Sequence, residues 1–377
     1  MDRHPAAPVE RCAVTPYGRG AGSSRVRVFG WLDRVDAEFT VGSYLSQPDA
    51  SPARLARHPL AVARAEARLA ALARSRPRRL LLHREASPLS RGWWEERLLA
   101  GAEFAVYDFD DALMWDHGEG GALRRLAPKS VKARLAVRRA DRVVAGNAVL
   151  ADWAARHQRD VVVVPSCVDL ADYTPKSRYA LHDPPRLGWI GSRGNEAYLL
   201  SIAAALTEVH RRTGARLTLV GTTTPTLGAL EAIVDRVPWS TATQRAALAG
   251  MDVGLMPLPD TPYSRGKCGY KLLQYAAAGL PAVASPTGVN AELLTRFGMP
   301  APRTPDEWTD ALLGLLDAHP DTRARTGRAA RATTARAYSY DAWLPAWTAA
   351  LELDTGVQVR GPAGRPAPEP AGRGRAR

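Results

Sequence analysis

The segment SRGKCGYKLLQYAAAGLP, residues 264–281, places two lysines where a helix is expected to begin. Lys267 and Lys271 are four residues apart, so both can lie on one side of the entry turn, and Gln274 follows on the same face. Two cations at a helix amino terminus oppose the helix dipole by about 0.3–1 kcal/mol each when exposed. We therefore interpret the segment as a site for an anion such as a diphosphate, with the Gln274 amide free to donate to and accept from sugar hydroxyls. A solvated helix end is the alternative interpretation.

Two glycine-rich turns can serve the same anion. GRGAGSSR, residues 18–25, and GSRGN, residues 191–195, each follow an expected strand and open an expected helix. Backbone N–H groups at such a turn point at the ligand, and glycine lets it approach closely. The side chains that would take part are Gly22, Ser23, Arg25, Ser192 and Arg193. Neither turn has the Gly-Lys-Ser/Thr of a Walker loop, and an ordinary serine-capped turn is the alternative for both.

A histidine and three aspartates end two further strands. His83 in LLLHREASP can bond a substrate hydroxyl as a neutral imidazole, or can be satisfied by the backbone. Asp108, Asp110 and Asp111 in YDFDDALMWD can bind a metal through hard oxygen ligands, cap the next helix, or bind an acceptor hydroxyl or amine. We favour acceptor binding, with helix capping for one of the three. Nearby Trp115 can stack on a sugar or pack in the core.

The sequence predicts a fold of parallel α/β layers, which would hold these residues in position. Short β-rich runs alternate with longer helical patterns, which is typical of parallel sheets covered by helices. We expect strands at residues 12–17, 37–45, 78–83, 104–109, 142–147 and 160–166, and again at 186–192, 215–221, 236–239, 252–258 and 281–285. The alternation is interrupted by a stretch with three prolines. Two Rossmann-like domains facing across a cleft are therefore expected.

The expected boundaries follow from the same pattern. They are a disordered start (1–11), a first α/β domain (12–172), a linker (173–186), a second α/β domain (187–337), helices able to cross back to the first domain (338–354) and a disordered basic tail (355–377).

Composition limits the class of protein. The 377 residues are 46% hydrophobic, with no apolar run long enough to span a membrane and no secretory signal at the amino terminus. Three scattered cysteines suit a reducing cytoplasm, and neither they nor the eight histidines show metal-ligand spacing. The net charge of +13 fits nucleic acid, an anionic membrane or an anionic substrate, or a general bias toward arginine. No motif supports nucleic acid, so we expect no nucleic-acid partner.

Three stretches together resemble a known family. MDVGLMPLPDTPYSRGKCGYKLLQYAAAGLPAVASPTGVNAELL (251–294), LGWIGS (187–192) and VVAGNAVLADWAARHQRDVVVVPSCVDLADYTP (143–175) are similar to glycosyltransferases of the GT-B fold, closest to the retaining family GT4. Pro165 and Asp169 match the Pro…Val-Asp pattern at the end of the family's first domain. The resemblance covers most of residues 12–353.

The resemblance implies an activity. Such enzymes move a sugar from a nucleoside-diphosphate sugar to a hydroxyl or amine acceptor, keep the anomeric configuration, and usually need no metal and no permanently bound cofactor. The family's motif has two glutamates eight positions apart, where this chain has Gly266 and Gln274. Gln274 can still bond a ribose, whereas the contact of the first glutamate with the donor sugar is missing. A catalytically silent relative that binds a nucleotide or a protein partner is the alternative.

The resemblance also distributes roles. The base-binding loop of such enzymes follows the third strand of the second domain, so Val237 and Trp239 are candidates for nucleobase contact, with packing the alternative for Trp239. Catalytic candidates are His83, Lys267 and Lys271. Donor-binding candidates are Gly22, Ser23, Arg25, Ser192, Arg193, Trp239, Gly269, Tyr270, Leu272 and Gln274. Acceptor-binding candidates are Asp108, Asp110 and Asp111.

The first domain would bind the acceptor, which can be a small molecule, a glycan or a lipid-linked molecule. Two arginine-heavy helices, expected at 54–76 and 124–139, are candidates for peripheral contact with an anionic membrane at its cytoplasmic face, at about 1 kcal/mol per cation. A solvated helix face is the alternative for both.

Overall fold

The computed structural model describes residues 10–46, 50–116 and 121–353. The predicted basic tail, 355–377, lies outside the described residues, as does the predicted disordered start except for its last two residues. Arg11 already belongs to the first strand.

The amino-terminal domain (N-domain) is built on a six-stranded parallel sheet with the order β2-β1-β3-β4-β5-β6. Every neighbouring pair is parallel. The strands are β1 (Arg11–Tyr17), β2 (Thr40–Leu45), β3 (Arg79–His83), β4 (Phe104–Phe109), β5 (Arg142–Ala145) and β6 (Val161–Val163). All six predicted runs form strands, which confirms the predicted α/β class for this half.

Two predicted helices of the N-domain are each divided by a proline. The 54–76 pattern becomes α3 (Pro52–Arg57) and α4 (Pro59–Ser75), because Pro59 has no N–H to donate and His58 before it leaves the helical region at φ −128°. Pro128 likewise divides the 124–139 pattern into α6 (Ala122–Leu126) and α7 (Lys129–Arg139). The other helices are α1 (Gly22–Ser24), the π-helical turn η1 (Arg25–Phe29), α2 (Gly30–Leu32), α5 (Trp93–Gly101), the 3-10 turn η2 (Leu113–Trp115), α8 (Ala148–Ala155) and the 3-10 turn η3 (Leu170–Asp172).

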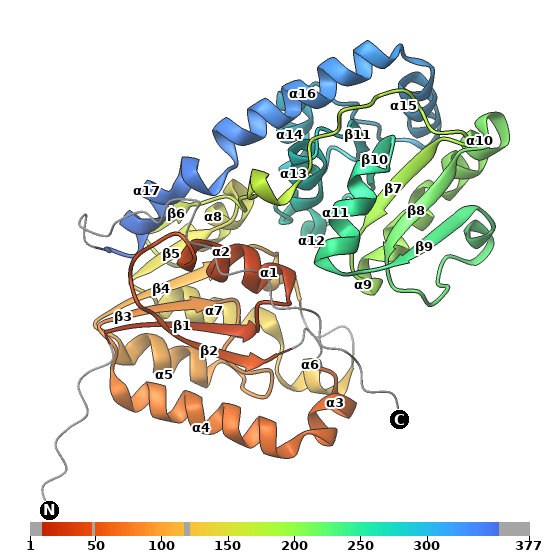
Figure 1. Cartoon of the computed structure of the whole chain (residues 1–377). Helices are drawn as coiled ribbons and strands as arrows, with labels where there is room; N and C mark the ends of the chain where they lie inside the picture. The colour runs from red at the N-terminus through yellow and green to blue at the C-terminus, as the bar shows by residue number, and fades with distance from the viewer. Residues whose placement is uncertain (1–9, 47–49, 117–120, 354–377) are drawn as a thin grey trace, which may run out of the picture.

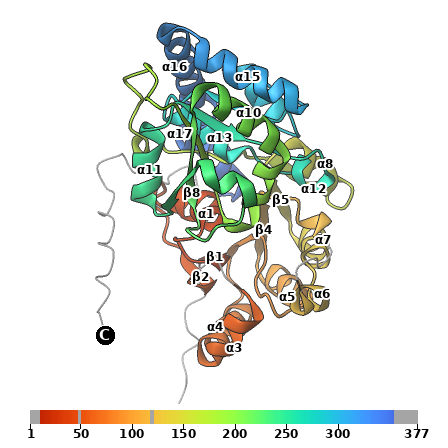
Figure 2. The same ribbon diagram turned by 90° about the vertical axis from the view of Figure 1, so that its right-hand side faces the viewer.

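The carboxyl-terminal domain (C-domain) holds a five-stranded sheet in the order β11-β10-β7-β8-β9, again with parallel neighbours. Its strands are β7 (Arg186–Ile190), β8 (Arg216–Gly221), β9 (Val234–Pro238), β10 (Val253–Met256) and β11 (Ala282–Ala284). Its helices are α9 (Arg193–Glu196), η4 (Ala197–Ile202), α10 (Ala203–Thr213), η5 (Gly228–Ile233), α11 (Thr241–Ala249), α12 (Pro262–Arg265), α13 (Tyr270–Ala277), α14 (Asn290–Phe297) and α15 (Pro305–Asp317). Figures 1 and 2 show the two domains as separate layered units.

Both faces of each sheet are buried, as expected for parallel strands covered by helices. In β1, Cys12 and Val14 join one apolar cluster of the N-domain, whereas Ala13 between them joins the cluster on the opposite face. The C-domain sheet separates two clusters in the same way, with Ile190 on one side and Trp189 on the other. Because both faces are covered, most strands are buried along nearly their whole length, which explains the short apolar runs in the sequence.

The chain passes between the domains twice. After β6 it runs through Val168 toward the C-domain, and it returns where α16 (Pro320–Ala337) is followed by α17 (Tyr340–Ala350) (Figure 1). The two passages touch, because Val168 N donates to Tyr338 O at 2.9 Å and Val168 forms a β-bridge with Ser339. Helix α17 packs on the N-domain, where Trp347 stacks on Trp31 with ring centroids 5.4 Å apart.

The irregular segment after Tyr173 is fastened to the C-domain. Lys176 Nζ donates to Met251 O at 2.6 Å, and the Tyr179 hydroxyl donates to Gly279 O at 2.9 Å. Helix α16 passes close to the same turn, because a Cβ added to Gly327 would lie 2.0 Å from Gly279 O. The two backbones can approach this closely because residue 327 has no Cβ.

We predict that Gly327→Ala destabilises the protein by about 1–3 kcal/mol, because the new methyl group meets backbone that cannot move aside. Gly314→Ala is the matched control, since Gly314 also lies inside a helix but has open space around its Cβ position. That control should gain about 0.5–1 kcal/mol from helix propensity. Urea unfolding of both variants checks this, and equal effects would contradict it.

Candidate active site in the interdomain cleft

A cavity of about 710 Å³ lies between the two domains. Its lining comes mainly from segments beyond the carboxyl ends of strands in both sheets, including residues between 20 and 25 after β1, between 191 and 195 after β7, and between 267 and 274 beyond β10 and α12. Ligands of open α/β sheets bind at such ends. Seven arginines and lysines and three aspartates line the cavity. Among the described lining residues positive charge therefore prevails, which favours an anionic ligand.

The two lysines of the opening segment both reach this cavity, but from different structures. Helix α13 begins at Tyr270 after Gly269, which has a left-handed φ of 64°, so only Lys271 lies in the first turn. The prediction that Lys267 also lies in that turn is wrong, because α12 and a connecting loop precede the helix. Lys267 Nζ lies 3.6 Å from Asp111 Oδ1, while Lys271 Nζ lies 5.3 Å from the centre of the Trp189 ring.

The environment of Lys271 weakens its hold on a proton. Burial lowers the pKa of Lys271 to about 8; the positive charge of Lys267 adds to this effect and Asp111 opposes it. A bound dianion would restore the charged form. In the cavity without a ligand, Lys271 is therefore an ammonium group with too little counter-charge.

Helix α13 exposes one face to the cavity and buries the other. Tyr270 and Gln274 line the cavity with Lys271, and Gln274 Nε2 also donates to the Tyr173 hydroxyl at 3.1 Å. Leu272 is fully buried in the C-domain core. Its predicted role as a donor-binding side chain needs correction, since residue 272 lies about 200° around the helix from residue 274.

The glycine-rich turns line the cavity, and each leads into an uninterrupted run of helical residues, 22–32 and 193–213. Gly22, Ser23 and Arg25 belong to the three-residue α1 and the π-helical turn that follows it, and Ser192 precedes the four-residue α9 without capping it. Both turns therefore present backbone N–H groups at the positive end of a helical run, together with their hydroxyls and the Arg25 and Arg193 guanidinium groups.

Of the two candidates for contact with the nucleobase, Trp239 lines the cavity and Val237 does not. Trp239 lines the cavity with 40% of its surface exposed, and its indole N–H donates to Gln244 Oε1 at 2.9 Å. The Arg25 guanidinium lies 5.8 Å from the Trp239 ring centre, so the two domains approach one another here. Val237 does not line the cavity; it packs against the C-domain core, which corrects its predicted place beside the base.

Asp108 and His83 form a buried group outside the cavity lining. Asp108 is 1% exposed and accepts hydrogen bonds from Arg27 Nη2 at 2.5 Å and Nε at 3.2 Å, and His83 Nδ1 lies 2.7 Å from its Oδ1. Burial would raise the pKa of Asp108, but the Arg27 charge and the His83 hydrogen bond outweigh it and lower the pKa. Asp108 is therefore a buried counter-ion, which corrects its predicted role in acceptor binding.

His83 is itself fully buried and does not line the cavity. Its Nε2 has no hydrogen-bond partner within the described part of the chain, and Asp110 Oδ1 lies 4.0 Å away. A direct catalytic contact, as the sequence predicted, therefore does not fit this arrangement. Arg27 was missed because an arginine within RVRVF reads as the polar face of a surface helix.

The other two aspartates do line the cavity, each with a cationic neighbour. Arg84 Nε donates to Asp110 Oδ1 at 2.6 Å, and Asp111 Oδ2 accepts from the Tyr263 hydroxyl at 3.1 Å. Burial would raise the pKa of Asp110, but the charge of Arg84 outweighs it and the pKa falls. The Asp110 carboxylate is thus available as a hydrogen-bond acceptor.

The segment 263–268 of the C-domain is anchored in the N-domain. Asn147 Nδ2 donates to Gly266 O at 3.0 Å and to Lys267 O at 3.3 Å, and the Cys268 thiol donates to Asp110 O at 3.2 Å. A Cβ on Gly266 would lie 2.6 Å from Ala112 Cβ. The position at which the resemblance places a glutamate therefore has no room for a side chain in this arrangement.

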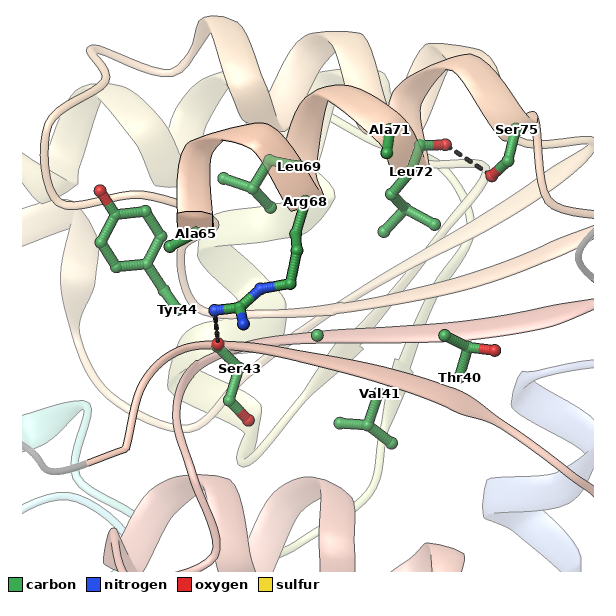
Figure 3. A pocket seen from close by; sticks show the side chains of 11 residues that line it. Thr40, Val41, Ser43, Tyr44, Ala65, Arg68, Leu69, Ala71, Leu72 and Ser75 are labelled. Carbon is green, nitrogen blue, oxygen red and sulfur yellow. Dashed lines mark hydrogen bonds between the residues drawn. The ribbon is translucent and has the colours of Figure 1, made fainter. Parts of the chain in front are cut away.

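A separate cavity of about 300 Å³ lies at the edge of the N-domain sheet, between β2 and α4 (Figure 3). Apolar side chains such as Leu69 and Leu72 line it, and Arg68 crosses it to donate to Ser43 O at 3.4 Å. None of its lining residues lines the interdomain cavity. Its apolar walls do not suit a charged ligand.

The described residues contain neither a cluster suited to a metal ion nor a helix suited to a membrane. No cluster of three or more histidine, cysteine, aspartate or glutamate side chains in 10–46, 50–116 and 121–353 is placed to hold a metal ion. Within the same ranges, no helix has both the length and the apolar character needed to cross a membrane.

Comparison with solved structures defines the class. The chain is similar to WaaG, a glycosyltransferase involved in lipopolysaccharide biosynthesis, with a TM-score of 0.58 and 17% identity over 92% of this chain and 100% of that one. It is similar to the E. coli trehalose-6-phosphate protein bound with UDP-2-fluoro glucose, with a TM-score of 0.61 and 12% identity over 93% and 100%. At these identities the similarity concerns the fold alone, and the chain has the GT-B fold of glycosyltransferases.

A further similarity is to a mutant of S. aureus TarM in complex with fondaparinux, alpha-GlcNAc-glycerol and UDP, with a TM-score of 0.53 and 12% identity. It covers 72% of this chain and 55% of that one, so the chain spans about half of the length of TarM. The family model described as glycosyl transferases group 1 matches residues 184–318. The similarity to this family therefore concerns the C-domain. A search of curated proteins gave no significant match.

The buried ion pair gives a stability prediction. Asp108→Ala should destabilise the protein by about 3–5 kcal/mol, because it leaves the Arg27 charge buried without its partner. The matched control is Asp33→Ala, which breaks the exposed Arg19–Asp33 pair and should cost at most about 1 kcal/mol. Chemical denaturation measures both, and a similar small loss in the two variants would contradict the assignment.

Proposed function

We propose that the protein is a retaining glycosyltransferase of the GT4 type, which transfers a sugar from a nucleoside-diphosphate sugar to a hydroxyl or amine acceptor without a metal. The observation that carries the proposal is the convergence of Lys267, Lys271, Arg193 and Arg25 on one cleft between two GT-B domains. Complexes of two structural neighbours, with UDP and with UDP-2-fluoro glucose, support a donor of this kind.

The donor would lie mainly against the C-domain. Its diphosphate would meet the Lys271 ammonium group, the Ser192 hydroxyl and the Arg193 guanidinium group, with the backbone at Gly269 close by. Gln274 would bond the ribose, and Trp239 would stack on the base, as its exposed ring in the cavity allows.

The chemistry follows from where charge develops. Cleavage of the glycosidic bond leaves negative charge on the departing diphosphate and positive charge on the sugar. Fixed cations such as Lys267 and Lys271 stabilise the former without reorganising, as oxyanion donors do. The departing phosphate can accept the proton of the acceptor hydroxyl, so no protein base is required. Asp110 and Asp111 can accept hydrogen bonds from the acceptor.

A second candidate function is a catalytically silent relative that binds a nucleotide or a protein. Gly266 favours it, because no side chain at that position can contact the donor sugar. The cations of the cleft suit a transferase and a nucleotide-binding relative alike, since a leaving diphosphate and a bound nucleotide are both anionic, so turnover is what separates the two.

The setting of the reaction is also a proposal. We place it in the cytoplasm, where α3, α4 and α6 can contact the surface of an anionic membrane through exposed arginines such as Arg57, Arg64 and Arg125. Such contact would suit a lipid-linked acceptor, while a soluble acceptor needs none.

Incubation with a panel of nucleoside-diphosphate sugars and acceptors tests the activity. We expect release of nucleoside diphosphate with at least one donor, and a product whose anomeric configuration, read by NMR, equals that of the donor. Lys271→Met keeps the apolar stem but removes the charge, and should lower kcat by about 10²–10³-fold. Its denaturation midpoint should not fall, because a buried, poorly compensated charge is removed.

Donor binding without turnover, by the wild-type protein and with every acceptor, would favour the silent relative. An inverted product would refute the retaining mechanism. If Lys271→Met reacted at the wild-type rate, Lys271 would not contribute to catalysis.

Because burial lowers the pKa of Lys271 to about 8, donor binding should depend on pH. The terminal phosphate of a nucleoside diphosphate is fully ionised above about pH 7. As the pH rises through 8, Lys271 in the free protein loses its proton, so the affinity for UDP should fall by up to about tenfold per pH unit. Lys271→Arg keeps its charge to far higher pH and should show no such fall. Calorimetric titrations of the wild type and of Lys271→Arg with UDP, from pH 7 to 9.5, check this prediction. The same fall in affinity with pH in both proteins would contradict it.

A further inference from the structure

Gln274 offers the cleft the carbonyl oxygen of its amide. The side chain lies on helix α13, is 5% exposed and lines the interdomain cavity. Its Nε2 donates to the Tyr173 hydroxyl at 3.1 Å. Its Oε1 accepts no hydrogen bond within the described part of the chain, and it is not fully enclosed. A ligand in the cavity can therefore reach this oxygen and donate a hydrogen bond to it.

Tyr173, the partner of the amide, belongs to the passage between the domains. Its side chain is 7% exposed, packs in the apolar cluster of the C-domain that includes Leu272, and does not line the cavity. Its hydroxyl also shares a hydrogen bond with Tyr270, the first residue of α13. A hydroxyl has one proton, so when that proton points to Tyr270 the oxygen is left to accept from Gln274, as observed.

The direction of this hydrogen bond matters because the two ends of an amide differ. A carboxylate offers an acceptor oxygen whichever way it is turned, whereas a glutamine turned by 180° offers N–H groups in place of its oxygen. The family resemblance places a glutamate where this chain has Gln274. A glutamine can serve as the same acceptor only while its amide is kept from turning, and the hydrogen bond to Tyr173 restrains it.

We propose that Tyr173 is a positioning residue, whose hydroxyl holds the N–H end of Gln274 away from the ligand and so gives the site an acceptor for a ribose hydroxyl. This rests on the proposed binding of a nucleoside diphosphate in the cleft. The site then selects a hydroxyl that can donate a hydrogen bond, because an ether at the same position leaves two acceptor oxygens facing one another. Tyr173 does not line the cavity, so it acts on the ligand through the amide of Gln274.

Isothermal titration of the full chain with matched nucleotides tests this selection. UDP, ADP and GDP first establish which base the site takes, and the tightest of them is compared with its 2′-O-methyl and 3′-O-methyl forms. The ratio of the dissociation constant of the ether to that of the hydroxyl form is the donor preference. We expect a donor preference of about tenfold or more at one of the two positions, since the ether loses a hydrogen bond and leaves a buried acceptor unpaired.

Variants separate positioning from a purely structural role. Tyr173→Phe keeps the ring in the core but frees the amide to turn and donate to the ether oxygen, so the donor preference should fall by about threefold or more. The matched control is Tyr179→Phe, which removes another buried hydroxyl of the same connecting segment, bonded to Gly279 O at 2.9 Å, and should leave the preference unchanged. In a Gln274→Glu background no turn can supply a donor, so Tyr173→Phe should there have no effect on the preference.

The outcomes for the two proposals differ. Failure of UDP, ADP and GDP to bind would overturn the proposed function and this inference with it. If a nucleotide binds, an unchanged donor preference in Tyr173→Phe would overturn the positioning role and leave the proposed function standing. An equal fall in Tyr179→Phe, or an equal effect of Tyr173→Phe in the Gln274→Glu background, would do the same. A wild-type preference near one would show that Gln274 accepts no hydrogen bond from the ribose, which also overturns the inference alone.

Discussion

The cleft has its present shape because residues 263–268 of the C-domain are held by the N-domain. Asn147 binds the carbonyls of Gly266 and Lys267, and Cys268 lies within the apolar cluster of the N-domain while its thiol donates to Asp110 O. These contacts use backbone groups and a buried thiol, so they depend on close approach rather than on screened surface charge. Lys267 and Lys271 take their positions from this anchored segment, and the geometry of the cavity therefore follows from one docking contact.

Electrostatics then give that geometry its selectivity. Cations from both domains line the cavity. Burial there disfavours the charged form of a lysine, and this lowers the pKa of Lys271. The N-domain can tolerate such a surplus because its deepest charges are balanced: Arg27 is matched by Asp108, and Lys132 by Glu85. Buried charge is thus neutralised within the domain, while uncompensated charge remains at the surfaces that meet ligands.

Much of the fold could be predicted from the sequence, and less of the site. All eleven predicted strands form, because strands buried on both faces leave short apolar runs that differ clearly from the helical patterns between them. The turns at 22–25, 192–193 and 267–274 were found because glycine beside basic residues is a local signal. The burial of His83 and Asp108, and the packing of Gly266 on Ala112, could not be found in this way. They depend on contacts between segments about 80 to 150 positions apart, and no local pattern carries that information.

The pairing of Val168 with Tyr338 and Ser339 has a mechanical consequence. Because the two connections between the domains lie side by side and are hydrogen bonded, they work as a single hinge rather than as two independent tethers. Twisting or sliding of one lobe over the other would shear that pair, whereas bending about it would not. The two domains can therefore open and close about this one hinge. The C-domain, which carries Lys267 and Lys271, then returns to the same position against the N-domain each time it closes.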